Sequence, residues 1–100
     1  MTRMGLYVRL EAKPGKEDEV AGFLEQGLTM ANKEATTPVW LAVRFGPRTF
    51  AIFDAFSREE DRKAHLEGPI AAALMAKAGE LLASPLQIEP YDILGAKLPG

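Results

Sequence analysis

One stretch near the middle of this 100-residue chain decides its fold: TFAIFDAF, residues 49–56. It is rich in aromatic and β-branched side chains, which favour strands. A short turn, residues 46–48, separates it from VWLAVRF, residues 39–45, which has a similar composition. Two such segments joined by so short a turn predict an antiparallel hairpin at the centre of the domain.

Before the hairpin, the sequence predicts a strand and then a helix. Residues 6–13 alternate apolar and polar side chains, which is typical of a half-buried strand. The apolar face of this strand carries Leu6, Val8, Leu10 and Ala12. Residues 16–33 then repeat apolar side chains at helical spacing. The expected buried face of this helix carries Val20, Phe23, Leu24, Leu28 and Ala31.

After the hairpin, the sequence predicts two helices and a last strand. Ser57 and Glu60 match an S-x-x-E capping box, which predicts the start of a helix that runs to about residue 67. Pro69 suits the first position of the next helix, over residues 70–83, which is so apolar that we expect it to be covered on more than one side. Residues 86–97 predict the last strand, and Pro90 within it favours a sheet edge or a bulge.

The order β-α-β-β-α-α-β predicts an α+β fold, the ferredoxin-like split βαβ arrangement with an antiparallel sheet, in a single domain over residues 1–100. Both faces of the hairpin are apolar: Leu41 and Val43 alternate with Trp40 and Ala42. The expected helices suffice for one face only. We therefore predict a homodimer, in which a second copy covers the other face.

Composition excludes several classes of function. The 12 Lys and Arg against 14 Asp and Glu leave no basic excess, so a nucleic-acid partner is not expected. No apolar run reaches the roughly 18 residues of a membrane span, and the first residues lack a signal-peptide pattern. The absence of cysteine excludes disulfides, thiolate metal sites and a Cys nucleophile. These features predict a cytoplasmic domain. The common nucleotide-binding and hydrolase motifs are also missing from the sequence.

His65 is the single histidine and the first candidate for chemistry. An ordinary pKa of roughly 6.5 would let it act as an acid or a base. Asp61, four residues earlier on the same helical face, is an expected partner. Alternatively, His65 only complements the negative C-terminal end of its helix. A metal site is not expected, since one His among scattered carboxylates lacks ligand spacing.

Asp54 is the second candidate, because it interrupts an apolar strand on the face that also carries Phe50 and Ile52. A buried carboxylate needs hydrogen-bonding partners. It could orient His65 or a substrate hydroxyl, or it could bond to the capping box that begins at Ser57.

Aromatic and basic side chains on the strands form the third group of candidates. Tyr7, Trp40, Phe53 and Tyr91 could line a cavity for a flat aromatic ligand, or they could fill the dimer core. Arg9 and Arg44 alternate in step with Tyr7 and Trp40. They could stabilise an anionic substrate or extend to the margin of the sheet.

The whole pattern resembles the antibiotic biosynthesis monooxygenase family, small dimeric α+β-barrel proteins that include quinol-monooxygenase-like members. The resemblance rests on KPGKE at 13–17, Glu34, FAIFDAF at 50–56, AHL at 64–66 and AKL at 96–98. The family's third strand has an aromatic-aliphatic run, an acid and an aromatic residue two positions later, and a histidine follows about ten residues downstream. Asp54, Phe56 and His65 match those places.

The resemblance implies oxidation of a quinol, an anthrone or another polyphenol with O₂, without a cofactor. His65 would be the base or hydrogen-bonding group, Asp54 would orient it, and Phe56, Trp40 and Tyr7 would shape the pocket. The haem-degrading branch of the family uses an Asn on the first strand, which residues 7–9 lack, and a Trp at the position where this chain has Phe56. The resemblance therefore does not extend to haem degradation. Two alternatives stay open: a non-catalytic small-molecule-binding or stress-response protein of the same fold, and an isomerase or other barrel enzyme.

Overall fold

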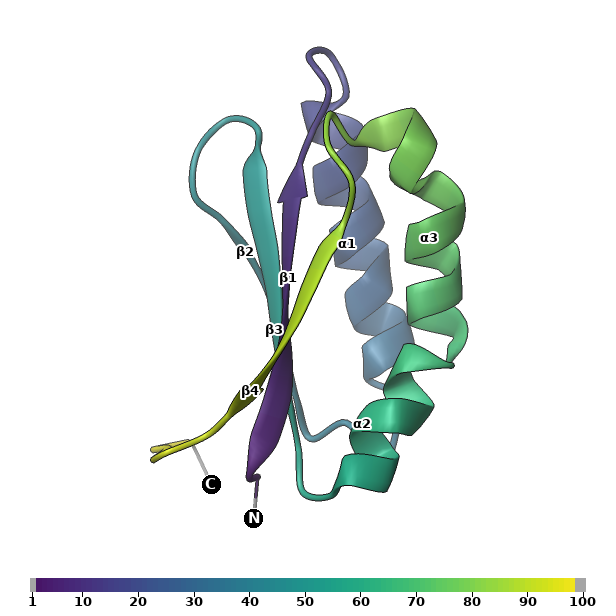
Figure 1. Cartoon of the computed structure of the whole chain (residues 1–100). Helices are drawn as coiled ribbons and strands as arrows, with labels where there is room; N and C mark the ends of the chain where they lie inside the picture. Colours follow the sequence, from purple (N-terminus) through teal and green to yellow (C-terminus); the bar gives the residue numbers. More distant parts are fainter. Residues whose placement is uncertain (1, 99–100) are drawn as a thin grey trace.

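The chain forms one layer of sheet and one layer of helices. The computed structural model describes residues 2–98. Its elements are β1 (Met4–Glu11), α1 (Glu17–Ala31), β2 (Val39–Arg44), β3 (Thr49–Phe56), α2 (Glu59–Leu66), α3 (Pro69–Leu81) and β4 (Gln87–Asp92). The four strands pair antiparallel in the order β2-β3-β1-β4, and all three helices lie on the same side of the sheet (Figure 1). The predicted α+β, ferredoxin-like order is therefore confirmed.

The core lies between the sheet and the helices, and the predicted faces of β1 and α1 supply five of its ten buried members. Its buried members are Val8, Leu10, Ala12, Val20, Leu24, Phe50, Ile52, Leu74, Leu81 and Leu82. Leu28 is an exception, because it is 46% exposed. The buried stripe of α1 follows Val20, Leu24, Gly27 and Ala31, and this narrower stripe leaves Leu28 on its flank.

The helix ends differ from the sequence prediction in one place. The capping box of Ser57 and Glu60 does not form, because α2 begins one residue later, with Arg58 as its N-cap residue and no side-chain cap hydrogen bond. Pro69 does occupy the first turn of α3, as predicted. Within the described chain, α3 buries only one face, and Met75 on another is 64% exposed. The prediction of cover on more than one side is therefore wrong for the single chain.

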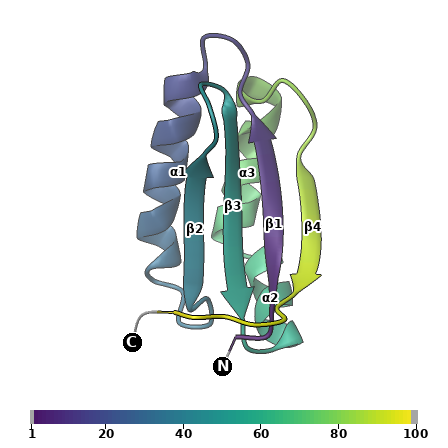
Figure 2. The same cartoon turned by 90° about the vertical axis from the view of Figure 1, so that its left-hand side faces the viewer.

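The last strand is shorter than predicted and lies at an edge of the sheet. β4 ends at Asp92, and Pro90 within it pairs only with β1, in keeping with its missing backbone donor. Residues 93–98 then run beneath the ends of the strands toward β2 (Figure 2). Leu94 and Leu98 of this segment are exposed.

No helix covers the other face of the sheet (Figure 2). Several of the side chains on this bare face are apolar. Tyr7 and Phe53 are cross-strand partners on it, with ring centroids 5.1 Å apart. Leu41 pairs with Phe53 from β2 and is 54% exposed. The two-faced apolar sheet is thus present. Over residues 2–98, none of the helices has the length and apolar character required to cross a membrane.

Candidate functional site

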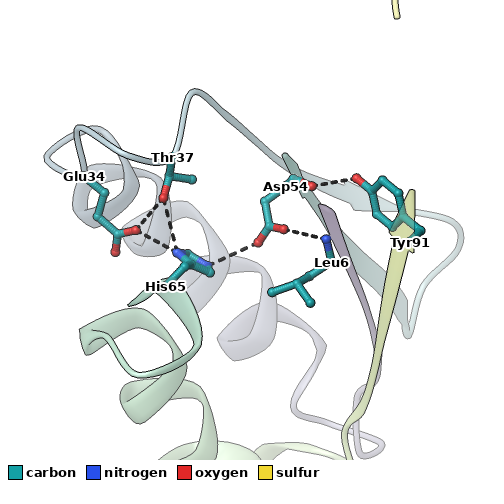
Figure 3. A network of polar contacts seen from close by, with 6 residues as sticks. All are labelled: Leu6, Glu34, Thr37, Asp54, His65 and Tyr91. Atoms are coloured by element: carbon teal, nitrogen blue, oxygen red, sulfur yellow. Dashed lines mark hydrogen bonds and ion pairs between the residues drawn. The ribbon is translucent and has the colours of Figure 1, made fainter. Parts of the chain in front are cut away.

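The imidazole ring of His65 is held between two carboxylates (Figure 3). His65 is only 7% exposed. Its Nδ1 lies 2.7 Å from Oε1 of Glu34, and its Nε2 lies 3.2 Å from Oδ2 of Asp54. The expected pairing with Asp61 is wrong, because the Asp61 carboxylate binds the Arg58 guanidinium at 3.2 Å. His65 therefore connects α2 to β3 and to the loop that precedes β2.

Asp54 is 1% exposed, and protein groups surround it. Its Oδ1 accepts the backbone N–H of Leu6 at 2.9 Å, so its other oxygen faces His65. The Tyr91 hydroxyl donates to the backbone carbonyl of Asp54 at 2.6 Å. Of the roles considered from the sequence, the contacts of Asp54 match the orientation of His65 and not a bond to the start of α2.

Gly5 makes the hydrogen bond from Tyr91 to the Asp54 carbonyl possible. Gly5 on β1 is the cross-strand partner of Tyr91 on β4, and the Tyr91 ring lies over Gly5 to reach Asp54 on β3. A Cβ at Gly5 would lie 2.1 Å from the Asp54 carbonyl oxygen and 2.4 Å from the Tyr91 ring. No side chain fits there, and the aromatic ring covers the gap that the glycine leaves.

Glu34 and Thr37, in the loop between α1 and β2, complete the polar cluster. The Thr37 hydroxyl donates to Glu34 Oε1 at 2.8 Å and lies 3.5 Å from His65 Nδ1. Sequence reasoning quoted Glu34 in the family pattern without assigning it a role, and it missed Thr37. The available signal was weak: two polar residues three positions apart in a loop before the edge strand β2.

The position of the carboxylates determines the protonation state of His65. A neutral imidazole has one N–H and can donate to one carboxylate only, whereas an imidazolium donates to both. Burial lowers the pKa of His65, but the hydrogen bonds and charges of Asp54 and Glu34 raise it, and the net result is a pKa above its ordinary value of 6.5. The two contacts and the raised pKa both favour the imidazolium form, in which each ring nitrogen donates to a carboxylate.

A cavity of about 40 Å³ lies beside this cluster, between the sheet and the helices. Asp54 and His65 contribute to its wall, and the other lining residues are apolar. A second cavity of about 130 Å³ lies between α1, α3 and the sheet. Trp40, Ile52, Ile70 and Leu74 line both cavities. The buried Nε1 of Trp40 has no hydrogen-bond partner among residues 2–98.

The residues predicted to line the pocket do not all lie on the same face of the sheet. Trp40 pairs with Asp54 in the sheet and shares its face, whereas Tyr7 and Phe53 lie on the opposite face. The ring of Phe56 packs 5.3 Å from that of His65. Arg44 is remote: its guanidinium lies over the Phe50 ring and donates to turn carbonyls.

The separation follows from the alternation of side chains along a strand. Neighbouring residues point to opposite faces, and the register places Leu41, not Trp40, opposite Phe53. The single aromatic pocket predicted from the sequence is therefore two separate surfaces. Arg9 also lies on the open face, where it pairs with Glu11 at 2.9 Å.

The two carboxylates lie on opposite sides of the His65 ring, so the three groups do not converge on one point. Within the part of the chain that the structure describes, there is no group of three or more His, Cys, Asp or Glu side chains that could hold a metal ion. The arrangement can bind and release protons, orient an oxygen atom of a ligand, and place a positive charge next to the smaller cavity.

Comparisons with known proteins agree with this architecture. No protein-family model and no curated protein sequence matches the chain. A solved structure of a protein of unknown function from Nitrosomonas europaea is 56% identical, with 100% of this chain and 97% of that one covered and a TM-score of 0.96.

More distant solved structures share the fold. A candidate antibiotic biosynthesis monooxygenase from Nitrosomonas europaea is 16% identical, with 92% of this chain and 90% of that one covered and a TM-score of 0.81. Another from Caulobacter crescentus is 18% identical, with 94% and 92% covered and a TM-score of 0.80. At such identities the likeness is one of fold.

Proposed function

This chain belongs to the family of the 56%-identical Nitrosomonas europaea protein of unknown function and has the antibiotic biosynthesis monooxygenase fold, and from this premise we propose that it oxidises a quinol, an anthrone or another polyphenol with O₂, without a cofactor. One observation carries the proposal: Asp54 and His65 together form the polar wall of an otherwise apolar cavity. The cytoplasmic location predicted from the sequence stays a prediction.

The chemistry needs an anion in a dry environment. A phenolic substrate becomes reactive toward O₂ when it loses a proton. The apolar walls exclude water, which strengthens electrostatic interactions inside the cavity. A carboxylate beside the cavity can accept the proton, and the His65 imidazolium favours the anion that remains.

Access to the cluster depends on Trp40. Ligand pockets usually measure about 300–1,000 Å³, more than either cavity here. Because Trp40 lines both cavities, a shift of its side chain would join them into one chamber beside His65. The unpaired indole N–H of Trp40 would then gain a substrate oxygen as acceptor.

The bare face of the sheet supports a homodimer. Tyr7, Leu41 and Phe53 present apolar surface there, and Leu94 and Leu98 add exposed apolar side chains from the C-terminal segment. A second copy packed sheet against sheet would bury these groups. In this proposal, Tyr7 and Phe53 belong to the interface between protomers.

A non-catalytic small-molecule-binding or stress-response protein of the same fold is the second candidate. It is favoured by the fact that both ring nitrogens of His65 are already engaged by carboxylates. A ligand could touch the ring only if one of these contacts gave way.

Oxygen uptake separates the two candidates. Metal-free protein would be mixed with a panel of hydroquinones and anthrones in aerated buffer. We expect uptake above the blank, and a fall of about 10²- to 10³-fold in the His65→Gln variant, since removing one group that stabilises a developing anion costs about that much. A shift in melting temperature without oxygen uptake would establish the binding protein instead. Product formation under strict anaerobiosis would indicate an isomerase.

A further inference from the structure

Glu34 is the member of the cluster that the proposed function does not yet use. It reaches His65 from the loop before β2, 31 residues away in the sequence. Its Oε1 accepts from both Thr37 and His65, while its buried Oε2 has no partner among residues 2–98. The side chain as a whole is 18% exposed, but a carboxylate oxygen buried without a partner still costs free energy. The contact with His65 therefore calls for a functional explanation.

The net charge of the cluster gives a functional explanation for Glu34. His65 and Asp54 alone would form a neutral pair of imidazolium and carboxylate. Glu34 adds a second carboxylate, so the three side chains carry one net negative charge. The cluster is largely shielded from water, because the side chains of Asp54, His65 and Glu34 are 2%, 6% and 18% exposed. Such a cluster gains by binding one proton, because the proton makes it neutral.

The other charged side chains nearby leave this charge uncompensated. On α2, Arg58 pairs with Asp61 and Glu60, and Arg62 pairs with Glu59 and donates to the Gly5 carbonyl. On β4, burial and the negative charge of Asp54 raise the pKa of Tyr91, whose hydroxyl therefore stays a neutral donor.

We propose that Glu34 is a positioning residue that makes the His65–Asp54 pair a proton acceptor. This inference rests on the proposed function, and it explains why a pair that would be neutral on its own has a third, negatively charged partner. Glu34 keeps the ring of His65 charged through Nδ1. The carboxylate of Asp54, which lines the cavity, can then accept a proton on a lone pair that its contacts with Leu6 and His65 leave unused.

The step is a simple proton transfer. The O–H bond of a phenolic substrate breaks, its electron pair stays on the substrate oxygen, and the proton bonds to a carboxylate oxygen of Asp54. The negative charge moves from the cluster to the substrate, next to the His65 imidazolium. Because the three groups are coupled, the bound proton belongs to the cluster as a whole.

The test begins with the charge of His65, and it needs no substrate. His65 is the single histidine, so the nitrogen chemical shifts of its ring can be assigned without ambiguity. In the wild-type protein at neutral pH we expect an imidazolium with both nitrogens protonated. A neutral ring would overturn the inference, whether or not any variant folds.

The decisive variant is Glu34→Gln, which keeps an oxygen acceptor for His65 and Thr37 but removes the charge. We expect the pKa of His65 to fall in this variant, since one of the two carboxylates that raise it is lost. Glu60→Gln is the matched control, because it removes the same charge from a side chain that is 74% exposed, and it should leave the pKa unchanged. An unchanged pKa in Glu34→Gln would contradict the proposal.

A pH–rate profile with the hydroquinone panel then tests whether the cluster of Glu34, His65 and Asp54 acts as the proton acceptor. A less negative cluster binds a proton more weakly, so in Glu34→Gln the acidic limb of the profile should move to lower pH while the plateau rate falls. A merely structural role would lower the plateau without moving the limb, and that result would refute the inference. If the wild type shows no oxygen uptake, the proposed function fails, while the titration of His65 still decides the role of Glu34.

Discussion

Glu34 Oε1 lies 2.7 Å from His65 Nδ1, and this contact joins the loop before β2 to α2. On the opposite side of the same ring, Asp54 holds α2 to the sheet at 3.2 Å. One buried side chain thus connects three segments of the chain, so its protonation state affects stability as well as chemistry. The two carboxylates share one cation, and each depends on it for compensation.

Stability should depend on pH through His65. Its pKa in the folded protein is raised above the ordinary value of 6.5. The stabilisation is therefore fully present below about pH 6.5 and is lost as the pH rises through the raised pKa. Urea unfolding of the wild type and of His65→Gln, compared from about pH 6 to about pH 9, should show their difference in unfolding free energy shrink with rising pH. A difference that grows over this range would contradict the assignment.

Removal of the His65 ring should lower the free energy of unfolding strongly. In His65→Ala, the buried Asp54 and the partly buried Glu34 lose their shared cation, and breaking a buried ion pair typically costs about 3–5 kcal/mol. Chemical unfolding at neutral pH measures the loss. Asp61→Asn is the control, because Asp61 lies on the same helix but binds Arg58 instead of His65. A loss in His65→Ala no larger than in Asp61→Asn would show that the cluster contributes little.

The position of Trp40 can be tested from α1. A Cβ at Gly27 would lie 3.1 Å from the Trp40 ring, whereas a Cβ at Gly22 on the same helix meets nothing within 4 Å. Gly22→Ala should stabilise the protein by about 0.5–1 kcal/mol, the usual gain of Ala over Gly in a helix. Gly27→Ala should gain less, because the methyl group displaces the indole.

A displaced Trp40 should also change ligand binding, since it lines both cavities. We expect the affinity for hydroquinones, measured by calorimetry, to change in Gly27→Ala and to stay constant in Gly22→Ala. Equal affinity and equal stabilisation in the two variants would exclude Trp40 as the gate between the cavities.

Gly5 offers a stricter steric test. In Gly5→Ala, the methyl group would collide with the Asp54 carbonyl and with Tyr91, so strands or ring must shift. Overpacking of this kind costs about 1–3 kcal/mol. Gly46→Ala is the control, because a Cβ there meets nothing within 4 Å, and it should change the midpoint of urea unfolding little. Similar midpoints for both variants would contradict the described fit of Tyr91 over Gly5.

The sequence predicted the elements well because its patterns are local. Alternation along β1 and helical spacing along α1 depend on residues a few positions apart, so the buried face of β1 was recognised, and that of α1 was recognised except for Leu28 and Gly27. The role of Glu34 could not be recognised in this way, because its partner lies 31 residues further along the chain. A loop carries no periodicity that would aim a side chain at a distant helix.

The split of the aromatic residues has a different physical reason. Alternation shows that Trp40 and Leu41 point to opposite faces, but it does not show which of them shares a face with Asp54. That depends on the register between β2 and β3, and a slip of one residue exchanges the faces. Tyr7 and Phe53 were therefore grouped with Trp40 although they lie on the other side of the sheet.

The homodimer proposal makes the last prediction. Leu41 is 54% exposed on the bare face of the sheet, next to Phe53. A charge placed there would have to be buried without a partner in a sheet-to-sheet interface, so Leu41→Glu should shift the protein from dimer to monomer. Met75→Glu is the control, because Met75 is 64% exposed on α3, on the helical side of the molecule (Figure 1). Size-exclusion chromatography with light scattering at micromolar concentration distinguishes the outcomes. A monomeric wild type would refute the proposal, and a Leu41→Glu variant that stays dimeric would move the interface away from this face.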